Sequence, residues 1–458
     1  MNDTLTSFLR SWSVVDSKVT PTKELMDWIF QRIASTEVVI HRISLEQCAP
    51  WFYDPIEGCI RNENRSFFSI AGFKSQEFEQ PIILQQEIGY LGILCKEISG
   101  VMHFLMQAKI EPGNVNCVQL SPTIQATKSN FTQKHGGRKP PYLDYFLNAS
   151  KYEVVVDQIQ SEQSSRFYKK RNRNIILRVE EDIPILPSHR WMTLGQIKRL
   201  MREDNLVNMD TRTVLSCIPF SKLCLFPEEL LDLSEDFKDK ALFRSIFLGE
   251  KANYLPHVFE YINNQKMFAN DEPKLVPLSE LKTWKMQDEE FVCIHPYPFK
   301  VVFCDITIEG REVHQWTQPL FEANGIATFG LICCEEAGRL KFLVRASPEA
   351  GCFDSLELGP TVQQEAVAGF QEVDEITHFF WDKLHTGCGI FFDHLLSEEG
   401  GRFYHEQNRN VLLRVRKEEL PSLPKGYFLL DYKTLNEMVQ INNILNIQLR
   451  NLLSLLEV

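Results

Sequence analysis

The chain has 458 residues, of which 44% are hydrophobic and 24% charged, proportions typical of ordinary globular proteins. Its net charge of −12 excludes a general affinity for nucleic acid or for acidic membrane surfaces. No run approaches the roughly 18 apolar residues of a membrane span, and the start MNDTLTSFLRSW has an acid where a signal peptide has bases. We therefore expect a cytoplasmic protein.

The twelve cysteines show no CxxC pair and no regular spacing. In a chain without an export signal, this pattern indicates reduced and mostly buried thiols, with no metal site.

The first half of the chain predicts a helix at each end and short strands between them. An opening helix is predicted by apolar residues at helical spacing: Leu25, Trp28, Ile29 and Ile33. GYLGILCKE and VMHFLMQAKI, separated by a short polar turn, predict a β-hairpin, and YEVVVDQIQ and NIILRV predict further strands. Thr193 has the position of an N-cap for a closing helix. The prediction is an α+β fold in which helices pack on a mixed, mostly antiparallel sheet.

The second half repeats the first in the same order. RFYKKRNRNIILRV (166–179) returns as RFYHEQNRNVLLRV (402–415), LSPTIQ as LGPTVQ, and NLVNMDTRTVLS as NILNIQLRNLLS. Trp51 and Trp284 correspond in ISLEQCAPW and VPLSELKTW, and we expect both to be core anchors. These collinear matches indicate two tandem copies of one module of about 200 residues, a size that suits a single domain.

Three segments follow from this repeat. Residues 1–218 form the first module and 257–458 the second, with a connector at 219–256 that has no counterpart elsewhere and is apolar enough to form docked helices. Where the copies differ, the first keeps more polar chemistry. We therefore expect the first module to hold the working site and the second a degenerate one.

Several of these segments resemble the NDP-hexose 2,3-dehydratase family of deoxysugar biosynthesis. The most specific are AKIEPGNVNCVQLSPTIQATKSNFTQKHGG, DQIQSEQSSRFYKKRNRN and LSEEGGRFYHEQNRN. The resemblance covers nearly the whole chain and includes the duplication. It implies dTDP-4-keto-6-deoxyglucose as substrate, a 3,4-diketo-2,6-dideoxy sugar nucleotide as product, and a homodimer of Nudix-type modules. The Nudix catalytic box is absent from both halves, so metal-dependent pyrophosphate hydrolysis is not expected.

The implied reaction needs a base, a donor for the C4 oxygen and an acid for the departing hydroxyl, but no redox cofactor. The polar loop 125–146 is the richest source of such groups, and its second-half counterpart loses most of them. Its candidate general base or acid is His135, because an imidazole titrates near neutral pH, and its alternative acid is Tyr142. Its candidate substrate-binding residues are Gln125, Thr127, Asn130 and Arg138.

A basic window follows this loop. Arg166 and Arg173 recur in the second half, whereas Lys170 and Arg171 become Glu406 and Gln407. Because losing cations weakens an anion site, the change at Lys170 and Arg171 favours a first-half site that binds the pyrophosphate. The retained Arg166 and Arg173 are explained equally by the fold or by a ligand site common to both halves, and all four are candidate substrate-binding residues. In a strand, Arg171 and Arg173 would lie on one face and Asn172 and Asn174 on the other. Only one of these faces can contact the pyrophosphate.

Two further residues near this window are candidates for catalysis. Glu162 recurs as Glu398 and is either a salt-bridge partner of the arginines or a catalytic base. Tyr168 recurs as Tyr404 and is either structural or an acid. The alternatives to a dehydratase are 3-epimerase chemistry on the same sugar nucleotide and a non-catalytic nucleotide-sugar binding protein.

Overall fold

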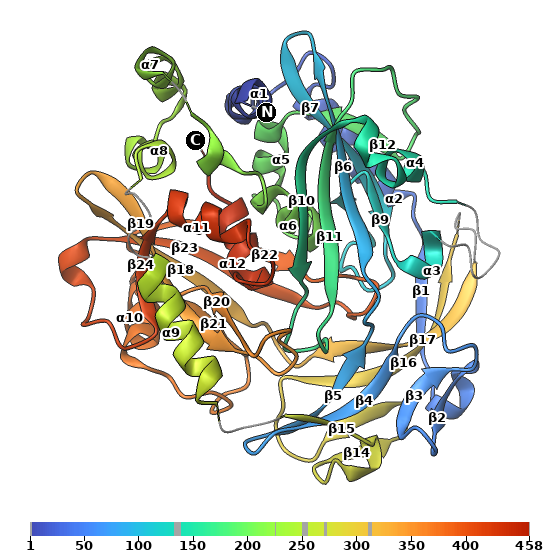
Figure 1. Cartoon of the computed structure of the whole chain (residues 1–458). Helices are drawn as coiled ribbons and strands as arrows, with labels where there is room; N and C mark the ends of the chain where they lie inside the picture. Colours follow the sequence, from blue (N-terminus) through green and yellow to red (C-terminus); the bar gives the residue numbers. More distant parts are fainter. Residues whose placement is uncertain are drawn as a thin grey trace.

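The computed structural model describes residues 2–131, 139–224, 226–249, 255–269, 273–309 and 314–457. Each half of the chain contributes one large and one small β-sheet, and the two large sheets lie on either side of a central layer of helices (Figure 1). The predicted α+β class and the two similar halves are thus confirmed.

The large sheet of the first half has the strand order β10-β11-β6-β7-β12, with β8 paired to β7 and β9 to β6. The predicted hairpin is β6 and β7, and the β6–β11 pair is parallel while the remaining pairs are antiparallel. The strands are β6 (Gly89–Ile98), β7 (Val101–Ile110), β8 (Val118–Ser121), β9 (Ile124–Ala126), β10 (Glu153–Ser161), β11 (Arg171–Arg178) and β12 (His189–Met192).

The large sheet of the second half has the same topology. Its order is β20-β19-β18-β23-β22, with β21 on β18 and β24 on β19, and β18–β23 is again the parallel pair. The strands are β18 (Thr328–Glu336), β19 (Arg339–Pro348), β20 (Leu356–Gly359), β21 (Val362–Gln364), β22 (Ile390–Ser397), β23 (Gln407–Val415) and β24 (Tyr427–Asp431). The sequence repeat is therefore a structural repeat.

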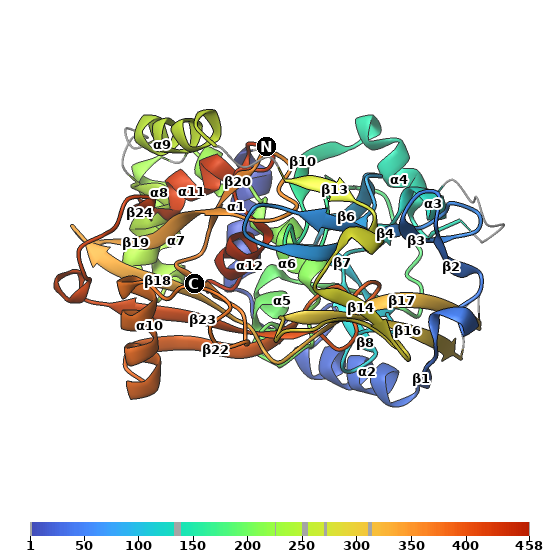
Figure 2. The same ribbon diagram turned by 90° about the horizontal axis from the view of Figure 1, so that it is seen from below.

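The two small sheets exchange one strand with each other (Figure 2). Strand β1 (Val38–Arg42) of the first half pairs with β16 of the second, and β13 (Lys274–Val276) of the second half pairs with β4 of the first. Neither small sheet is therefore built from one half alone. The remaining strands are β2 (Trp51–Asp54), β3 (Cys59–Asn62), β4 (Ser69–Lys74), β5 (Glu79–Leu84), β14 (Trp284–Gln287), β15 (Glu290–Cys293), β16 (Phe299–Ile308) and β17 (Gln315–Ala323).

Helices α6 and α12 pack on each other between the two large sheets (Figure 1). The predicted opening helix is α2, which buries Leu25, Trp28 and Ile29, and Thr193 caps α5 by accepting a hydrogen bond from Gln196 N at 3.1 Å. The helices are α1 (Asn2–Ser13), α2 (Thr22–Ala34), α3 (Lys128–Phe131), α4 (Leu143–Leu147), α5 (Leu194–Leu200), α6 (Met209–Ser216), α7 (Pro227–Asp236), α8 (Lys240–Phe247), α9 (Leu255–Met267), α10 (Glu375–Thr386), α11 (Tyr432–Val439) and α12 (Ile447–Ser454).

The connector does have a counterpart, because α8 occupies in the second half the place that α1 occupies in the first. Ser11 Oγ donates to Met102 O at 2.6 Å and accepts from Leu194 N at 2.9 Å. Ser245 Oγ likewise donates to Leu340 O at 2.5 Å and accepts from Tyr432 N at 2.7 Å. The expectation that the connector has no counterpart in the first half is therefore wrong for α8. The sequence similarity between α1 and α8 is too short to be detected without these contacts.

Trp51 and Trp284 are core residues, as predicted. Both are buried, and each indole also bonds across the repeat: Trp51 Nε1 donates to Thr317 O at 2.9 Å and Trp284 Nε1 to Glu79 O at 3.0 Å. All twelve cysteines are free thiols, and most are buried. Among the described residues, no helix has the length and apolar character needed to cross a membrane.

Candidate functional site

Polar side chains gather on the face of the first large sheet that is turned toward the central helices. Gln125 in β9 lies between Ile124 and Ala126, which pack on the opposite face, so its amide points inward. Its Nε2 donates to Glu111 Oε1 at 3.0 Å, and its Oε1 accepts from Asn208 Nδ2 at 3.2 Å. Lys109 pairs with the same Glu111 oxygen at 2.7 Å. The predicted candidate Gln125 is thus the centre of a hydrogen-bonded cluster.

Glu162 lies just beyond the end of β10, on the same face. Its Oε1 accepts from Asn172 Nδ2 at 2.5 Å, and its backbone N donates to Lys170 O at 3.0 Å. Lys170 Nζ donates to Glu87 O at 2.5 Å. Glu162 and Lys170 are both buried, 5% and 6% exposed, so two oppositely charged groups share a site that is almost closed to solvent. The partner of Glu162 is an amide rather than the arginine suggested by its position.

The second half contributes to this same cluster through the β22–β23 loop. The charges of Glu399 and Arg402 act on Lys170, and Arg402 Nε donates to Gln85 Oε1 at 3.1 Å. The site is therefore composite. These side chains, here called the first polar network, are Lys109, Glu111, Gln125, Glu162, Lys170, Asn172, Asn208, Asp210, Glu399 and Arg402.

Burial shifts the pKa values of Glu162, Lys170 and Asp210 in the direction that favours the uncharged form of each side chain. Loss of hydration raises the pKa of Glu162 to about 7, and the like charge of Glu399 acts in the same direction, against the opposing effects of Lys170, Arg450 and Asn172. Burial lowers the pKa of Lys170, against the carboxylates of Glu162 and Glu87. Burial and the neighbouring acids raise the pKa of Asp210. A carboxyl with a pKa near 7 can both take up and release a proton at working pH.

Several buried polar atoms in the first polar network, or next to it, have no hydrogen-bond partner among the described residues. They are Glu111 Oε2, Asn174 Oδ1 and both side-chain polar atoms of Asn114. Because a buried polar atom without a partner costs about 1–3 kcal/mol, such a group at a site usually pairs with solvent or ligand.

The second half carries an equivalent cluster, here called the second polar network. Asn446 Nδ2 donates to Glu349 Oε1 at 2.9 Å and to Gln363 Oε1 at 3.0 Å, as Asn208 does to Gln125. Burial raises the pKa of Glu398 and of Glu406 to about 7. Its members are Gln163, Arg166, Glu349, Gln363, Glu398, Glu406, Asn408 and Asn446.

Arg166 belongs to this second network and not to the first. Its guanidinium pairs with Glu365 Oε1 at 3.1 Å and lies 4.2 Å from the centre of the Phe299 ring. Arg402, its counterpart, crosses in the opposite direction. The β10–β11 and β22–β23 loops thus each deliver one arginine to the other half, a crossing that the linear sequence does not reveal.

The other predicted cations also lie apart, so the basic window does not form one cluster. Arg171 stacks on Phe353 at 3.8 Å, and Arg173 pairs with Asp157 at 2.6 Å and bonds Tyr90. The predicted alternation is confirmed: Asn172 and Asn174 bond on the inner face while Arg173 reaches Tyr90 in the outer cluster. Of the four cations, Lys170 alone joins the first network.

The two predicted tyrosines lie outside the network. Tyr142 Oη donates to Pro184 O at 2.8 Å and accepts from Leu186 N at 3.1 Å, and its ring packs with the outer apolar cluster. The ring of Tyr168 lies 6.1 Å from that of Phe73 in the small sheet. Both placements are compatible with structural roles, and a catalytic role for either stays a prediction.

The remaining candidates lie in or beside the loop after β9. His135 and Arg138 fall outside the described residues. Asn130 is in α3, but its side chain is outside the described part. Thr127 follows β9, and its carbonyl accepts from Phe131 N at 3.1 Å.

Sequence reasoning missed several members of the first network. Glu111 and Asn208 recur as Glu349 and Asn446, and Asp210 becomes Gln448, so comparing the copies position by position offered a signal for all three. The sequence contains no such signal for Glu399, because comparing the two copies along the chain does not assign a second-half residue to a first-half site.

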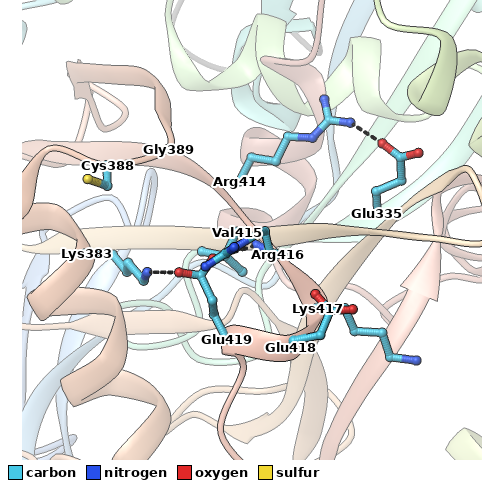
Figure 3. A pocket seen from close by; sticks show the side chains of 10 residues that line it. All are labelled: Glu335, Lys383, Cys388, Gly389, Arg414, Val415, Arg416, Lys417, Glu418 and Glu419. Atoms are coloured by element: carbon cyan, nitrogen blue, oxygen red, sulfur yellow. Dashed lines mark hydrogen bonds and ion pairs between the residues drawn. The ribbon is translucent and has the colours of Figure 1, made fainter.

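A pocket of about 510 Å³ opens at the opposite end of β23 from the second network (Figure 3). Arg414 points to Glu335 and Lys383 to Glu419, at 3.1 and 2.6 Å, while Lys417 pairs with Glu336. These cations are neutralised by carboxylates and are partly exposed. The pocket therefore lacks the buried, incompletely bonded groups of the two networks.

Comparison with known proteins identifies the family of the chain. A profile of the NDP-hexose 2,3-dehydratase family matches residues 22–218 and 255–456. The chain is 39% identical over 444 residues to a dTDP-4-dehydro-6-deoxy-α-D-glucopyranose 2,3-dehydratase of Saccharopolyspora spinosa, covering 95% of this chain and 91% of that protein. Proteins of the same name from Amycolatopsis orientalis and Streptomyces violaceoruber are 32% and 35% identical, covering 94% and 95% of this chain and 89% and 97% of theirs. Matches of this length and identity, spanning both halves, show that the chain belongs to the NDP-hexose 2,3-dehydratase family.

Proposed function

We propose that the protein removes water from dTDP-4-keto-6-deoxyglucose to give the dTDP-3,4-diketo-2,6-dideoxy sugar. The observation that carries this proposal is the near full-length similarity to three relatives named for this activity. The first polar network supplies, in one buried place, the kinds of group that the reaction needs.

The reaction is a redox-neutral elimination. The C4 ketone acidifies the C3 proton, and a base that removes this proton leaves an enolate. The enolate expels the C2 hydroxyl, which leaves as water after gaining a proton, and the resulting enol takes a proton at C2 to become the diketone. Electrons balance within the sugar, so we expect no nicotinamide or other redox cofactor.

Glu162 is the best candidate for the base at C3. A carboxylate must be deprotonated to act, and a pKa of about 7 leaves a substantial fraction ionised at neutral pH while making it a stronger base than an ordinary glutamate. Asn172 holds one carboxylate oxygen at 2.5 Å and so fixes its direction. A positioned base of this kind contributes about 10² to 10⁴-fold.

Lys170 is the best candidate for the donor that stabilises the enolate oxygen or protonates the leaving hydroxyl. Its ammonium is buried, already oriented by Glu87 O, and its lowered pKa makes it a better acid than an exposed lysine. A preorganised donor in a closed site is worth about 3 kcal/mol of barrier. His135 remains the alternative acid or base, and Arg138 an alternative anion-binding residue, on sequence grounds.

We propose that the first half is the working site and the second a degenerate one. The first network has two lysines, Lys109 and Lys170, at positions that hold Ser347 and Glu406 in the second. A carboxylate in place of Lys170 would repel a diphosphate and offers no cation to the C4 oxygen. The asymmetry favours turnover in the first half.

The finer features implied by the family resemblance belong to the same proposal. We infer Nudix-type modules, supported by the mixed sheet with one parallel pair in each half. We also infer a cytoplasmic homodimer that binds the dTDP-sugar and no nucleic acid or membrane. Size-exclusion chromatography with light scattering tests the dimer.

Proton NMR in D₂O of dTDP-4-keto-6-deoxyglucose with the purified protein tests the activity. Loss of the C2 hydroxyl with deuterium entering C2 is the expected result. Deuterium at C3 with the hydroxyl retained would indicate epimerase chemistry instead. An unchanged spectrum with measurable binding would leave a nucleotide-sugar binding protein and refute the proposal.

A further inference from the structure

The end of strand β10, which leads directly into Glu162, pairs with β11 of its own half and is also bonded to the opposite half of the chain. Gln160 Nε2 donates to Val439 O at 2.7 Å, and Gln160 Oε1 accepts from Asn443 N at 3.2 Å. Ile159 N donates to Asn442 Oδ1 at 3.2 Å. The strand that delivers the proposed base is thus anchored on the segment between α11 and α12.

Arg450 makes the last of these contacts, one residue before Glu162. It is fully buried on α12, and its Nη2 donates to the carbonyl of Ser161, its Nη1 to Thr213 Oγ1, and its Nε to Leu445 O at 3.1 Å. Three donors of one rigid guanidinium therefore fix Ser161 relative to α6 and α12. A planar fork with several partners transmits position better than a single flexible bond.

We propose that Arg450 is a positioning residue for dehydration in the first half: by holding Ser161 it sets where the Glu162 carboxylate meets the sugar. This inference rests on the proposed function, in which Glu162 is the base at C3. Reacting groups must lie within narrow limits, and a displacement of about 1 Å costs on the order of 10²-fold in rate. Part of the catalytic alignment would then come from the module that does not itself turn over.

The duplication provides a matched control. Arg212 on α6 is buried like Arg450, and its Nη2 donates to Ser397 O at 2.7 Å, one residue before Glu398. Substituting Arg212 therefore removes the same kind of contact at the same depth, but next to the carboxylate of the degenerate network. Any general cost of losing a buried arginine appears in both variants.

The test compares Arg450→Lys and Arg450→Met with Arg212→Lys and Arg212→Met by steady-state kinetics and thermal unfolding. For Arg450→Met we expect kcat to fall by roughly 10 to 100-fold with KM changed by less than about 3-fold, because alignment rather than binding is lost. For Arg212→Met we expect a similar fall in Tm with kcat kept within about 3-fold of the wild type. If the Met variants do not fold, the Lys pair decides by the same comparison.

The pH profile provides a readout that a purely structural role would not move. Glu162 is faced by Lys170, Glu399 and Arg450 and by Asp210 of α6, and the charge of Arg450 helps to keep its carboxylate ionised. The acid limb of kcat/KM should therefore shift to higher pH in Arg450→Met and stay in place in Arg450→Lys. Equal losses of kcat in the Arg450 and Arg212 variants, or a loss confined to KM, would overturn the inference.

Glu162→Gln, measured in parallel, separates the two levels of the argument. If Glu162→Gln abolishes turnover while the Arg450 and Arg212 variants behave alike, the positioning role fails and the assignment of the base stands. If Glu162→Gln retains turnover, the assignment of the base fails and the positioning role fails with it.

Discussion

Replacing Glu357 by Gln should make the protein more stable at alkaline pH. Glu357 in β20 is 1% exposed; its Oε2 accepts from Ser161 Oγ at 2.7 Å, and its Oε1 has no partner among the described residues. The equivalent position in the first half is already an amide, since Gln119 Nε2 donates to Ser397 Oγ at 2.7 Å. The backbone environment therefore accommodates Gln at this depth.

The size of the effect follows from the pKa of the buried carboxyl. Burial, assisted by Glu349, raises the pKa of Glu357 from 4.5 to about 8. A carboxyl with a raised folded-state pKa contributes stability that is present below pH 4.5 and is lost as pH rises toward 8. At about 1.4 kcal/mol per pH unit, the wild type loses up to about 4 kcal/mol across this window, and the Gln variant avoids this loss.

Chemical denaturation of both proteins between pH 5 and pH 8.5 measures this difference. The Gln variant should match the wild type near pH 5 and exceed it by about 2–4 kcal/mol at pH 8.5. The mirror change, Gln119→Glu, should create the same pH-dependent loss on the other side of the molecule. If the free energy of unfolding changed with pH in the same way for the wild type and Glu357→Gln, the reasoning would be refuted. Such a result would show that ionisation of Glu357 does not destabilise the fold.

Three further predictions concern the site. Lys170→Glu should weaken dTDP-sugar binding by roughly 10 to 100-fold in calorimetry, since a charge-assisted bond is worth about 1.5–3 kcal/mol. The control Arg171→Gln, on the outer face, should change the affinity by less than about 2-fold. Equal losses of affinity in both variants would place the site elsewhere. Wild-type kcat/KM should rise with pH through about 7 as Glu162 deprotonates. Glu162→Gln should lower kcat by about 10² to 10⁴-fold, whereas Glu398→Gln should leave kcat unchanged. Tyr142→Phe should cost about 1 kcal/mol of stability with turnover unchanged, because its hydroxyl bonds backbone groups; a loss of turnover would instead assign it to the chemistry.

Features that depend on local periodicity could be predicted from the sequence. The hairpin of β6 and β7, the N-cap at Thr193, the buried tryptophans and the alternation of Asn172 and Arg173 across β11 all follow from spacing over a few residues. The repeat itself followed from sequence identity between the copies. Each of these features is decided by neighbours along the chain.

Features that depend on pairing between the halves could not be predicted. Arg166 and Arg402 occupy equivalent positions, which is equally consistent with each arginine binding within its own half. In the structure, however, each side chain bonds a residue of the opposite half. The four cations of the basic window look like one anion site in the linear sequence, but pleating and a change of direction before β11 send them to different surroundings. Only the tertiary arrangement distinguishes these cases.

The exchange of β1 and β13 between the small sheets limits how this chain can be divided. A fragment ending after the first module would keep β1, which belongs to the other small sheet, and would lack β13, which completes its own. Two copies of such a fragment could satisfy both edges only by trading β1 reciprocally, as in a swapped dimer. The full chain has the arrangement of such a dimer joined into one polypeptide, so genetic recombination could replace both modules together but not one module alone.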